Sequence, residues 1–181
     1  DGVAKLHSAM LAMQAHRQMV TRLAAKDGVA PAEMATAATQ ANAALADFGR
    51  WQAGELPDAP VADALKAAQA AWTKATAANE DLFAQAELHN DALFHVRGMM
   101  REVSEHTTLT QANDPAVFYT GRAATEWLPS LTEYTAQQGA VAIRVLGEGS
   151  IWVEDRTGLA ISRNMQDFLR SRIELELANA E

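Results

Sequence analysis

The stretch LKAAQAAWTKATAANEDLFAQAELHNDALFHVRGMMREVSEHT, residues 65–107, decides how this chain folds. Apolar and small residues recur along it in alternating steps of three and four, which is the spacing of a coiled-coil heptad. The pattern predicts one helix of about 48 residues, about 70 Å long at about 1.5 Å per residue. The positions on its stripe are Leu65, Ala68, Trp72, Ala75, Asn79, Leu82, Ala86, His89, Leu93, Val96, Met100, Val103 and Thr107.

Two helical patterns precede this stretch. The first covers about residues 3–25 and stops at Lys26-Asp27-Gly28. The second covers about residues 31–54 and opens with Pro31, a residue that suits the first turn because its missing N–H costs nothing there. Two prolines, Pro57 and Pro60, then mark a turn before the heptad stretch.

Two further helical patterns follow it. Asp114 is a candidate N-cap and Pro115 a candidate first helical residue for a helix that reaches about Leu146. Pro129 inside this helix should kink it or break it locally. The last helix is expected from about Trp152 to the end of the chain.

Element lengths suggest how these helices are arranged. The first two together match the third, and the last two roughly match each other. We therefore expect an all-α fold, an elongated antiparallel four-helix-bundle type with a long heptad-patterned third helix and a first arm interrupted near Asp27 to Pro31. Both termini would lie at one end. The helical pattern runs to both ends without caps, so residues 1–181 are expected to be a single domain excised from a longer protein.

Composition excludes several classes of protein. A net charge of −8 argues against a nucleic-acid binder. There is no cysteine, hence no disulfide or thiolate metal site, and no apolar run of the roughly 20 residues that would cross a bilayer. We expect no enzyme and no cofactor, because nucleophile-elbow and phosphate-loop motifs are missing. His89 and His95 are six residues apart on different helix faces, which disfavours a metal site.

The order of short motifs resembles a known family. The matching pieces are Gln14-Ala15-His16-Arg17, the break at Ala25-Lys26-Asp27, His89, Ser104-Glu105-His106-Thr107-Thr108-Leu109-Thr110, Asp114-Pro115, Phe118-Tyr119, Leu128-Pro129-Ser130-Leu131, Arg144, and Glu154-Asp155-Arg156. In this order they resemble the periplasmic sensor regions of bacterial methyl-accepting chemotaxis proteins and of related diguanylate cyclases and histidine kinases. Phe118-Tyr119 departs from the paired tyrosines expected there, and Gln137-Gln138-Gly139-Ala140 departs from the usual approach to Arg144.

The resemblance implies a helical periplasmic sensor domain, hung between two membrane-spanning helices that lie outside these residues. It also implies a homodimer and a signalling role in chemotaxis or a related pathway. It implies no particular ligand, because such domains diverge in their pockets, and likeness of fold alone does not establish function.

Three polar residues fall on stripes that should be buried: Arg17, Asn79 and His89. A buried charge is costly unless it is paired, so Arg17 must have a partner. For Asn79 and His89, one interpretation is control of helix register, as with single polar core positions of coiled coils.

Folding the expected helices back about their loops brings basic and aromatic residues to one level. Arg97 would lie opposite about residues 125–127, and Arg17 opposite about residues 99–100. The candidate ligand-binding set is Arg17, Arg97, Arg101, Tyr119, Arg122 and Trp127. Guanidinium groups beside aromatic walls suit a small carboxylate or another anion. The favoured alternative is ion pairing of these arginines to Glu102, Glu126, Glu174 and Glu176. A second candidate cluster is Asn79, Arg144 and Arg156 with Trp152.

Two functions follow from these patterns. The first is a sensor that detects a small, anionic molecule and signals by displacement of its helices. The second is a helical interaction or oligomerisation module without a small-molecule ligand.

Overall fold

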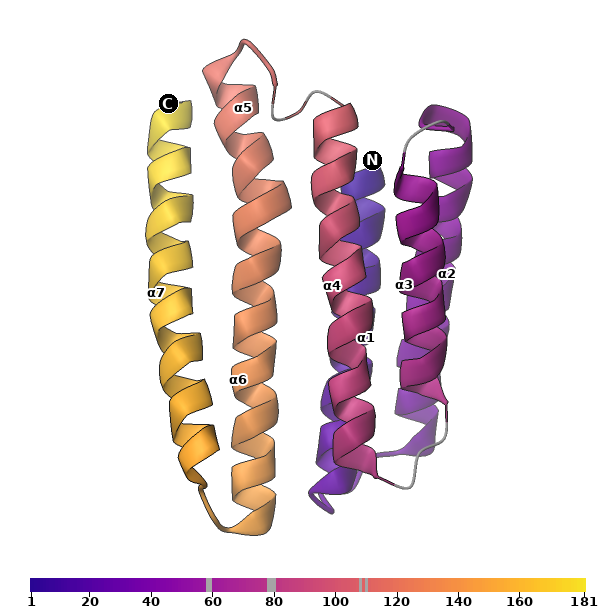
Figure 1. Cartoon of the computed structure of the whole chain (residues 1–181), viewed down its shortest axis with the longest axis vertical. Helices are drawn as coiled ribbons and strands as arrows, with labels where there is room; N and C mark the ends of the chain where they lie inside the picture. Colours follow the sequence, from indigo (N-terminus) through magenta and orange to yellow (C-terminus); the bar gives the residue numbers. More distant parts are fainter. Residues whose placement is uncertain (58–59, 78–80, 108, 110) are drawn as a thin grey trace.

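The computed structural model describes residues 1–57, 60–77, 81–107, 109 and 111–181. All regular structure in these residues is helical, so the expected all-α class is confirmed. The helices form two parts that lie side by side (Figure 1). One part is an antiparallel four-helix bundle, which we call the N-terminal bundle. The other is a pair of long helical arms, which we call the C-terminal hairpin.

The N-terminal bundle contains α1 (Gly2–Ala24), α2 (Pro31–Glu55), α3 (Val61–Thr76) and α4 (Leu82–His106). Each helix runs opposite to the one before it (Figure 1). Helix α1 packs on α2 and α4, and α3 packs on α4 and α2. The core between them is built from Leu, Met, Val and Ala with two large aromatic residues, Phe48 and Trp72.

The prediction of one long third helix was wrong. Helix α3 ends at Thr76, α4 begins at Leu82, and the two pack against each other as antiparallel partners. Gln85 closes the turn, because its Nε2 donates to the backbone oxygens of Ala75 and Ala77, both at 3.0 Å. The interrupted first arm was wrong for the same reason, since α1 and α2 also lie side by side.

The heptad pattern nevertheless identified the buried face correctly. Of its positions, Ala68, Trp72, Ala75, Leu93, Val96, Met100 and Val103 all belong to the core. A stripe of this kind shows which side of a helix is buried, but two antiparallel helices can bury it against each other as well as one continuous helix can. Asn79 lies outside the described residues.

The C-terminal hairpin begins with one long helical arm. It consists of α5 (Pro115–Arg122), a π-helical turn η1 (Ala123–Trp127) and α6 (Leu128–Glu148). The predicted N-cap is present, since Asp114 Oδ1 accepts from the backbone N–H of Ala116 at 2.9 Å. The π-turn directly precedes the first turn of α6, which contains Pro129. Proline has no backbone N–H to donate, and the wider π-turn accommodates this missing hydrogen bond. The helix therefore continues past Pro129.

The second arm is α7 (Val153–Ala180), which follows a left-handed Gly149 at φ 67°. It packs on α5, η1 and α6, while the hairpin meets the bundle through α6 against α1 and η1 against α4. The start of α1 and the end of α7 lie at the same end of the molecule, as expected (Figure 1). In the described residues we find no helix with the length and apolar character needed to span a membrane.

Candidate functional site

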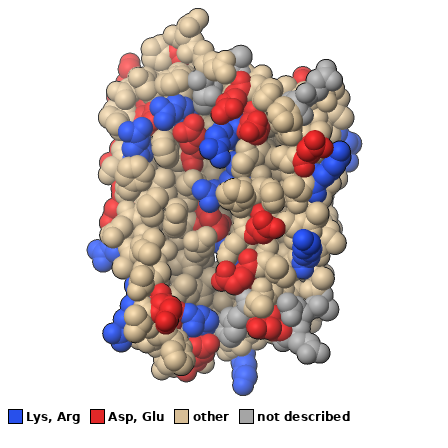
Figure 2. Space-filling model, viewed as in Figure 1, with Lys and Arg blue, Asp and Glu red and all other residues tan. Residues whose placement is uncertain are grey.

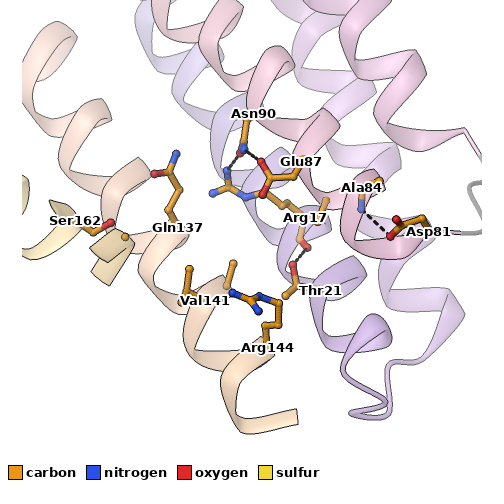
Figure 3. A pocket seen from close by; sticks show the side chains of 13 residues that line it. Arg17, Thr21, Asp81, Ala84, Glu87, Asn90, Gln137, Val141, Arg144 and Ser162 are labelled. Atoms are coloured by element: carbon orange, nitrogen blue, oxygen red, sulfur yellow. Dashed lines mark hydrogen bonds between the residues drawn. The ribbon is translucent and has the colours of Figure 1, made fainter. Parts of the chain in front are cut away.

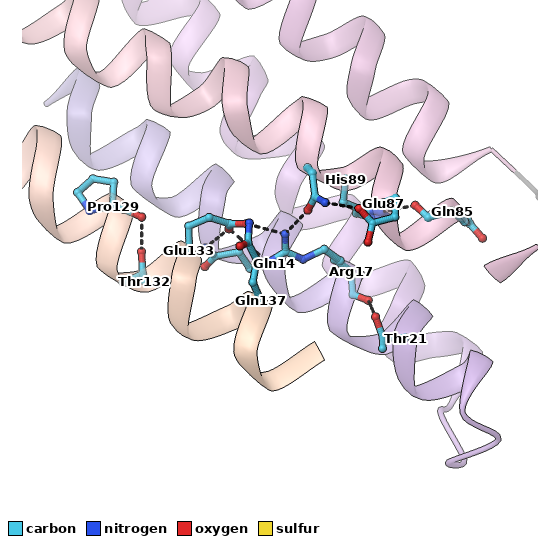
Figure 4. A network of polar contacts seen from close by, with 11 residues as sticks. Gln14, Arg17, Thr21, Gln85, Glu87, His89, Pro129, Thr132, Glu133 and Gln137 are labelled. Atoms are coloured by element: carbon cyan, nitrogen blue, oxygen red, sulfur yellow. Dashed lines mark hydrogen bonds and ion pairs between the residues drawn. The ribbon is translucent and has the colours of Figure 1, made fainter. Parts of the chain in front are cut away.

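A buried ion pair joins the two parts. Arg17 of α1 and Glu133 of α6 are 3% and 2% exposed, and Arg17 Nη1 lies 2.6 Å from Glu133 Oε1. Glu133 also accepts from Gln14 Nε2 at 2.9 Å and from Gln137 Nε2 at 2.8 Å (Figure 4). Arg17 Nη1 donates to Asn90 Oδ1 of α4 at 2.6 Å. These contacts connect α1, α4 and α6 through charge-assisted hydrogen bonds, the stronger kind.

The expectation that Arg17 must have a partner is therefore confirmed, but its expected level was wrong. Arg17 lies beside Asn90 rather than opposite residues 99–100. The error follows from the topology, because α1 is itself a full arm of the bundle and not half of a longer one. Glu133 had not been singled out from the sequence. Its helical spacing with Glu126, Ser130 and Gln137, which puts polar residues on one face of the arm, was the available signal.

Two histidines form a second buried contact, inside the bundle. His16 Nδ1 lies 2.8 Å from His89 Nε2, and His89 Nδ1 lies 2.9 Å from the Gln85 carbonyl oxygen. Since that carbonyl can only accept, His89 carries its proton on Nδ1, and its Nε2 accepts from His16. Burial lowers the pKa of His89 to about 4 and also lowers the pKa of His16. Both rings are thus neutral near pH 7, and Trp72 packs edge-on against each.

A small cavity, which we call the arginine cavity, lies between α4 and the π-turn. Its volume is about 290 Å³, and its walls include Arg97, Arg101, Trp127 and Ser130. Arg97 Nη2 donates to Ser130 Oγ at 2.9 Å. Within the described ranges neither Arg97 nor Arg101 has a carboxylate partner. Glu126 also lines this cavity, but it pairs with Arg122 at 3.6 Å.

The candidate set is therefore brought together only in part. Arg97, Arg101 and Trp127 share the arginine cavity. Arg122 does not line the cavity; its guanidinium lies 5.7 Å from the ring centres of both Phe118 and Trp127, and it pairs with Glu126 and Glu176. The ion-pair alternative thus holds for Arg122 but not for Arg97 or Arg101.

Two members of the set lie elsewhere. Tyr119 packs edge-on against Phe118, with ring centres 5.0 Å apart, and does not line the cavity. Arg17 lies further along α1, at the buried pair with Glu133. The single layer of six residues was therefore wrong, because it placed Arg17 on a first arm that the chain does not form.

A larger groove, which we call the interface groove, separates the bundle from the hairpin near the Arg17 pair. Its volume is about 510 Å³. One wall comes from α1 and α4, with Thr21, Glu87 and Asn90; the other comes from α6 and α7, with Gln137 and Ser162 (Figure 3). Acidic and basic side chains are mixed along the line where the two parts meet (Figure 2).

The second candidate cluster lies at the end of this groove. Arg144 forms ion pairs with Asp155 and, at 3.4 Å, with Glu148. Trp152 Nε1 donates to the same Glu148 at 3.3 Å. Arg156 is exposed and lies outside the lining of the groove.

Comparisons with protein-family models, with curated proteins and with solved structures give no match for this chain.

Proposed function

We propose that this chain is the sensory domain of a membrane receptor of the methyl-accepting chemotaxis type, and that it binds a small carboxylate in the arginine cavity. The observation that carries the proposal is a pair of arginines, Arg97 and Arg101, that face one cavity without a carboxylate partner in the described residues.

The chemistry of the cavity suits a carboxylate. Arg97 and Arg101 are one helical turn apart on α4, so their charges repel each other until an anion lies between them. Guanidinium groups bind carboxylates through paired, directional hydrogen bonds. The Ser130 hydroxyl donates to the Glu126 carbonyl oxygen at 2.8 Å and accepts from Arg97 Nη2, so it holds Arg97 in place, and the Trp127 ring adds an apolar wall. A volume of about 290 Å³ fits a compact metabolite rather than a large ligand.

The position of the cavity gives binding a mechanical consequence. The arginines belong to α4 of the bundle, whereas Trp127 and Ser130 belong to the hairpin. A ligand that contacts both sides favours the arrangement in which they are close, and it shifts the population towards that arrangement. The displacement would reach α1 and α7 at the end where both lie, as in signalling by small helix shifts (Figure 1).

The test is a thermal-shift screen of small mono- and dicarboxylates, with phosphate, sulfate and sodium chloride at matched ionic strength as comparisons. We expect one or more carboxylates to raise the melting temperature of the protein, and Arg101→Gln to abolish that rise. Arg163→Gln is the matched control, since Arg163 is an exposed arginine of α7 away from the cavity. An equal rise in both variants, or a rise that chloride reproduces, contradicts the proposed site.

A second candidate function is a helical module that only associates with another copy of the chain. The observation that favours it is an apolar stripe on α7, where Ile161, Phe168 and Leu175 recur every seven residues and are each about half exposed. Sedimentation of the wild type and of Phe168→Glu separates the two functions. A dimer that dissociates in the variant, together with no response to any carboxylate, favours the association module.

A further inference from the structure

We propose that the interface groove is a second binding site, and that it takes a small organic amine carrying further hydrogen-bond donors, such as a diamine or an amino alcohol. The groove is separate from the arginine cavity. It shares no lining residue with it and lies at the level of Asn90 on α4 rather than of Arg97 and Arg101.

The charges around the groove leave a negative excess. Arg17 is neutralised by Glu133. Arg144 faces two carboxylates, Asp155 and Glu148, so one negative charge remains there after pairing. Glu87 adds another negative charge on the opposite wall. A groove with this balance attracts cations, and because Glu87 is exposed this attraction weakens as salt is added.

Glu87 is the natural partner for an ammonium group. It lines the groove from α4, and its Oε2 accepts from Asn90 Nδ2 at 2.7 Å. No lysine or arginine of the described chain lies within ion-pair distance of it. Asn90 in turn is held by Arg17, so the Glu87 carboxylate is supported by the same network that joins the two parts. An ammonium group has three donors and no acceptor, which matches a carboxylate of this kind.

The facing wall offers acceptors for a second polar group. Gln137 uses its Nε2 to donate to Glu133, which directs its amide nitrogen away and leaves Oε1 as an acceptor beside the groove. Ser162 of α7 adds a hydroxyl (Figure 3). A ligand with one amino group at Glu87 and a second donor at Gln137 or Ser162 would bridge the two parts.

Small residues leave room for the body of such a ligand. Ala84, Ala86, Ala140 and Gly158 line the groove between its polar groups. A Cβ atom added at Gly158 would meet no atom within 4 Å, so this wall is open. The volume of about 510 Å³ accommodates a short aliphatic chain together with some water.

Calorimetric titration with 1,4-diaminobutane and with ethanolamine tests the proposal. We expect saturable binding of at least one of them to the wild type, and binding about tenfold weaker or more in Glu87→Gln, as is typical for loss of a charge-assisted hydrogen bond. Glu105→Gln is the matched control, because Glu105 is an exposed glutamate of α4 away from the groove. Butane-1,4-diol, which has the same length without the charges, should not bind.

Three outcomes overturn the proposal: no binding of either amine, equal weakening in Glu87→Gln and Glu105→Gln, or the same heat from magnesium chloride at matched charge concentration. Arg101→Gln should still bind the amine. Amine binding that survives in this variant, with no carboxylate response in the wild type, would reject the arginine-cavity function while supporting the interface groove.

Discussion

The N-terminal bundle and the C-terminal hairpin are both helical, but their interiors differ in chemistry. The bundle is filled with side chains such as Leu6, Met10 and Phe48, which are all fully buried and apolar. The hairpin instead buries Glu133, Asp155, Gln166 and Glu176 along its arms. Every member of the main apolar cluster lies before residue 104, so none belongs to the hairpin.

Because their interiors differ, we expect the bundle and the hairpin to have separate roles. Apolar burial is non-directional and large, and a close-packed core resists displacement. Buried ion pairs are directional, and their attraction is offset by the cost of desolvation, so they add less net stability than an apolar core does. They also fix one arrangement of two surfaces. We therefore expect the bundle to supply stability and the hairpin to supply the surface that moves.

The largest effect should come from a cavity in the bundle core. Phe48→Ala removes a fully buried ring of α2 and should lower the free energy of unfolding by about 4 kcal/mol. Urea denaturation followed by circular dichroism measures this loss. Phe94→Ala is the control on α4, where the ring is 69% exposed, and it should change stability by less than about 0.5 kcal/mol. Similar losses in both variants would show that the apolar core does not dominate.

The next effect should come from the ion pair that joins the two parts. Glu133→Gln leaves Arg17 buried without its carboxylate, and we expect a loss of about 3 kcal/mol or more. The double variant Arg17→Met with Glu133→Leu should recover most of it, because no charge is then left unpaired. Hydrogen exchange should show faster opening of α6 than of α2 in the single variant. Uniform opening would contradict separate roles for the two parts.

A third effect concerns the polar site inside the bundle, the His16–His89 pair. The pKa of His89 is about 4 in the folded protein and 6.5 as the ordinary value, so the unfolded chain binds the proton more readily between these pH values. Stability should therefore fall as pH drops from 6.5 to 4, by at most about 3 kcal/mol from His89. The lowered pKa of His16 acts in the same direction.

Urea denaturation at a series of pH values measures this slope. His89→Gln should flatten it, whereas His95→Gln should leave it unchanged, since His95 is partly exposed and pairs with Asp91 rather than with His16. A slope that persists in His89→Gln would assign the pH dependence to other groups.

The sequence predicted buried faces and caps better than it predicted connections. The stripe positions from Leu65 to Ala75 and from Ala86 to Val103 are buried as expected, and Asp114 caps α5. The chain reversal between Thr76 and Leu82 was missed because residues 77–81 contain neither glycine nor proline. A weaker local signal is present, because Asp81 Oδ1 accepts from the Ala84 N–H at 3.0 Å in the manner of an N-cap, and Gln85 adds hydrogen bonds from α4 back to the end of α3.

The sequence predicted which kinds of residue form the candidate site, but it did not predict which residues pair with each other. A charge on a buried stripe, Arg17, requires a partner whatever the fold. That the partner is Glu133, on a helix of the other part, depends on how the hairpin lies against α1. Arg97 and Trp127 were expected at one level and do share a cavity, because η1 packs directly against α4.

The smallest effect should come from the cap at the start of the hairpin. Asp114→Ala removes the acceptor for the Ala116 N–H and should cost about 1 kcal/mol. Hydrogen exchange should then rise in α5 and leave α1 to α4 protected, because the bundle has its own apolar core. Asp167→Ala, an exposed substitution within α7, controls for the loss of one negative charge. If Asp114→Ala instead loosened α1 and α5 equally, the two parts would unfold as one cooperative unit, and the hairpin could not move against the bundle in the way that signalling by helix displacement requires.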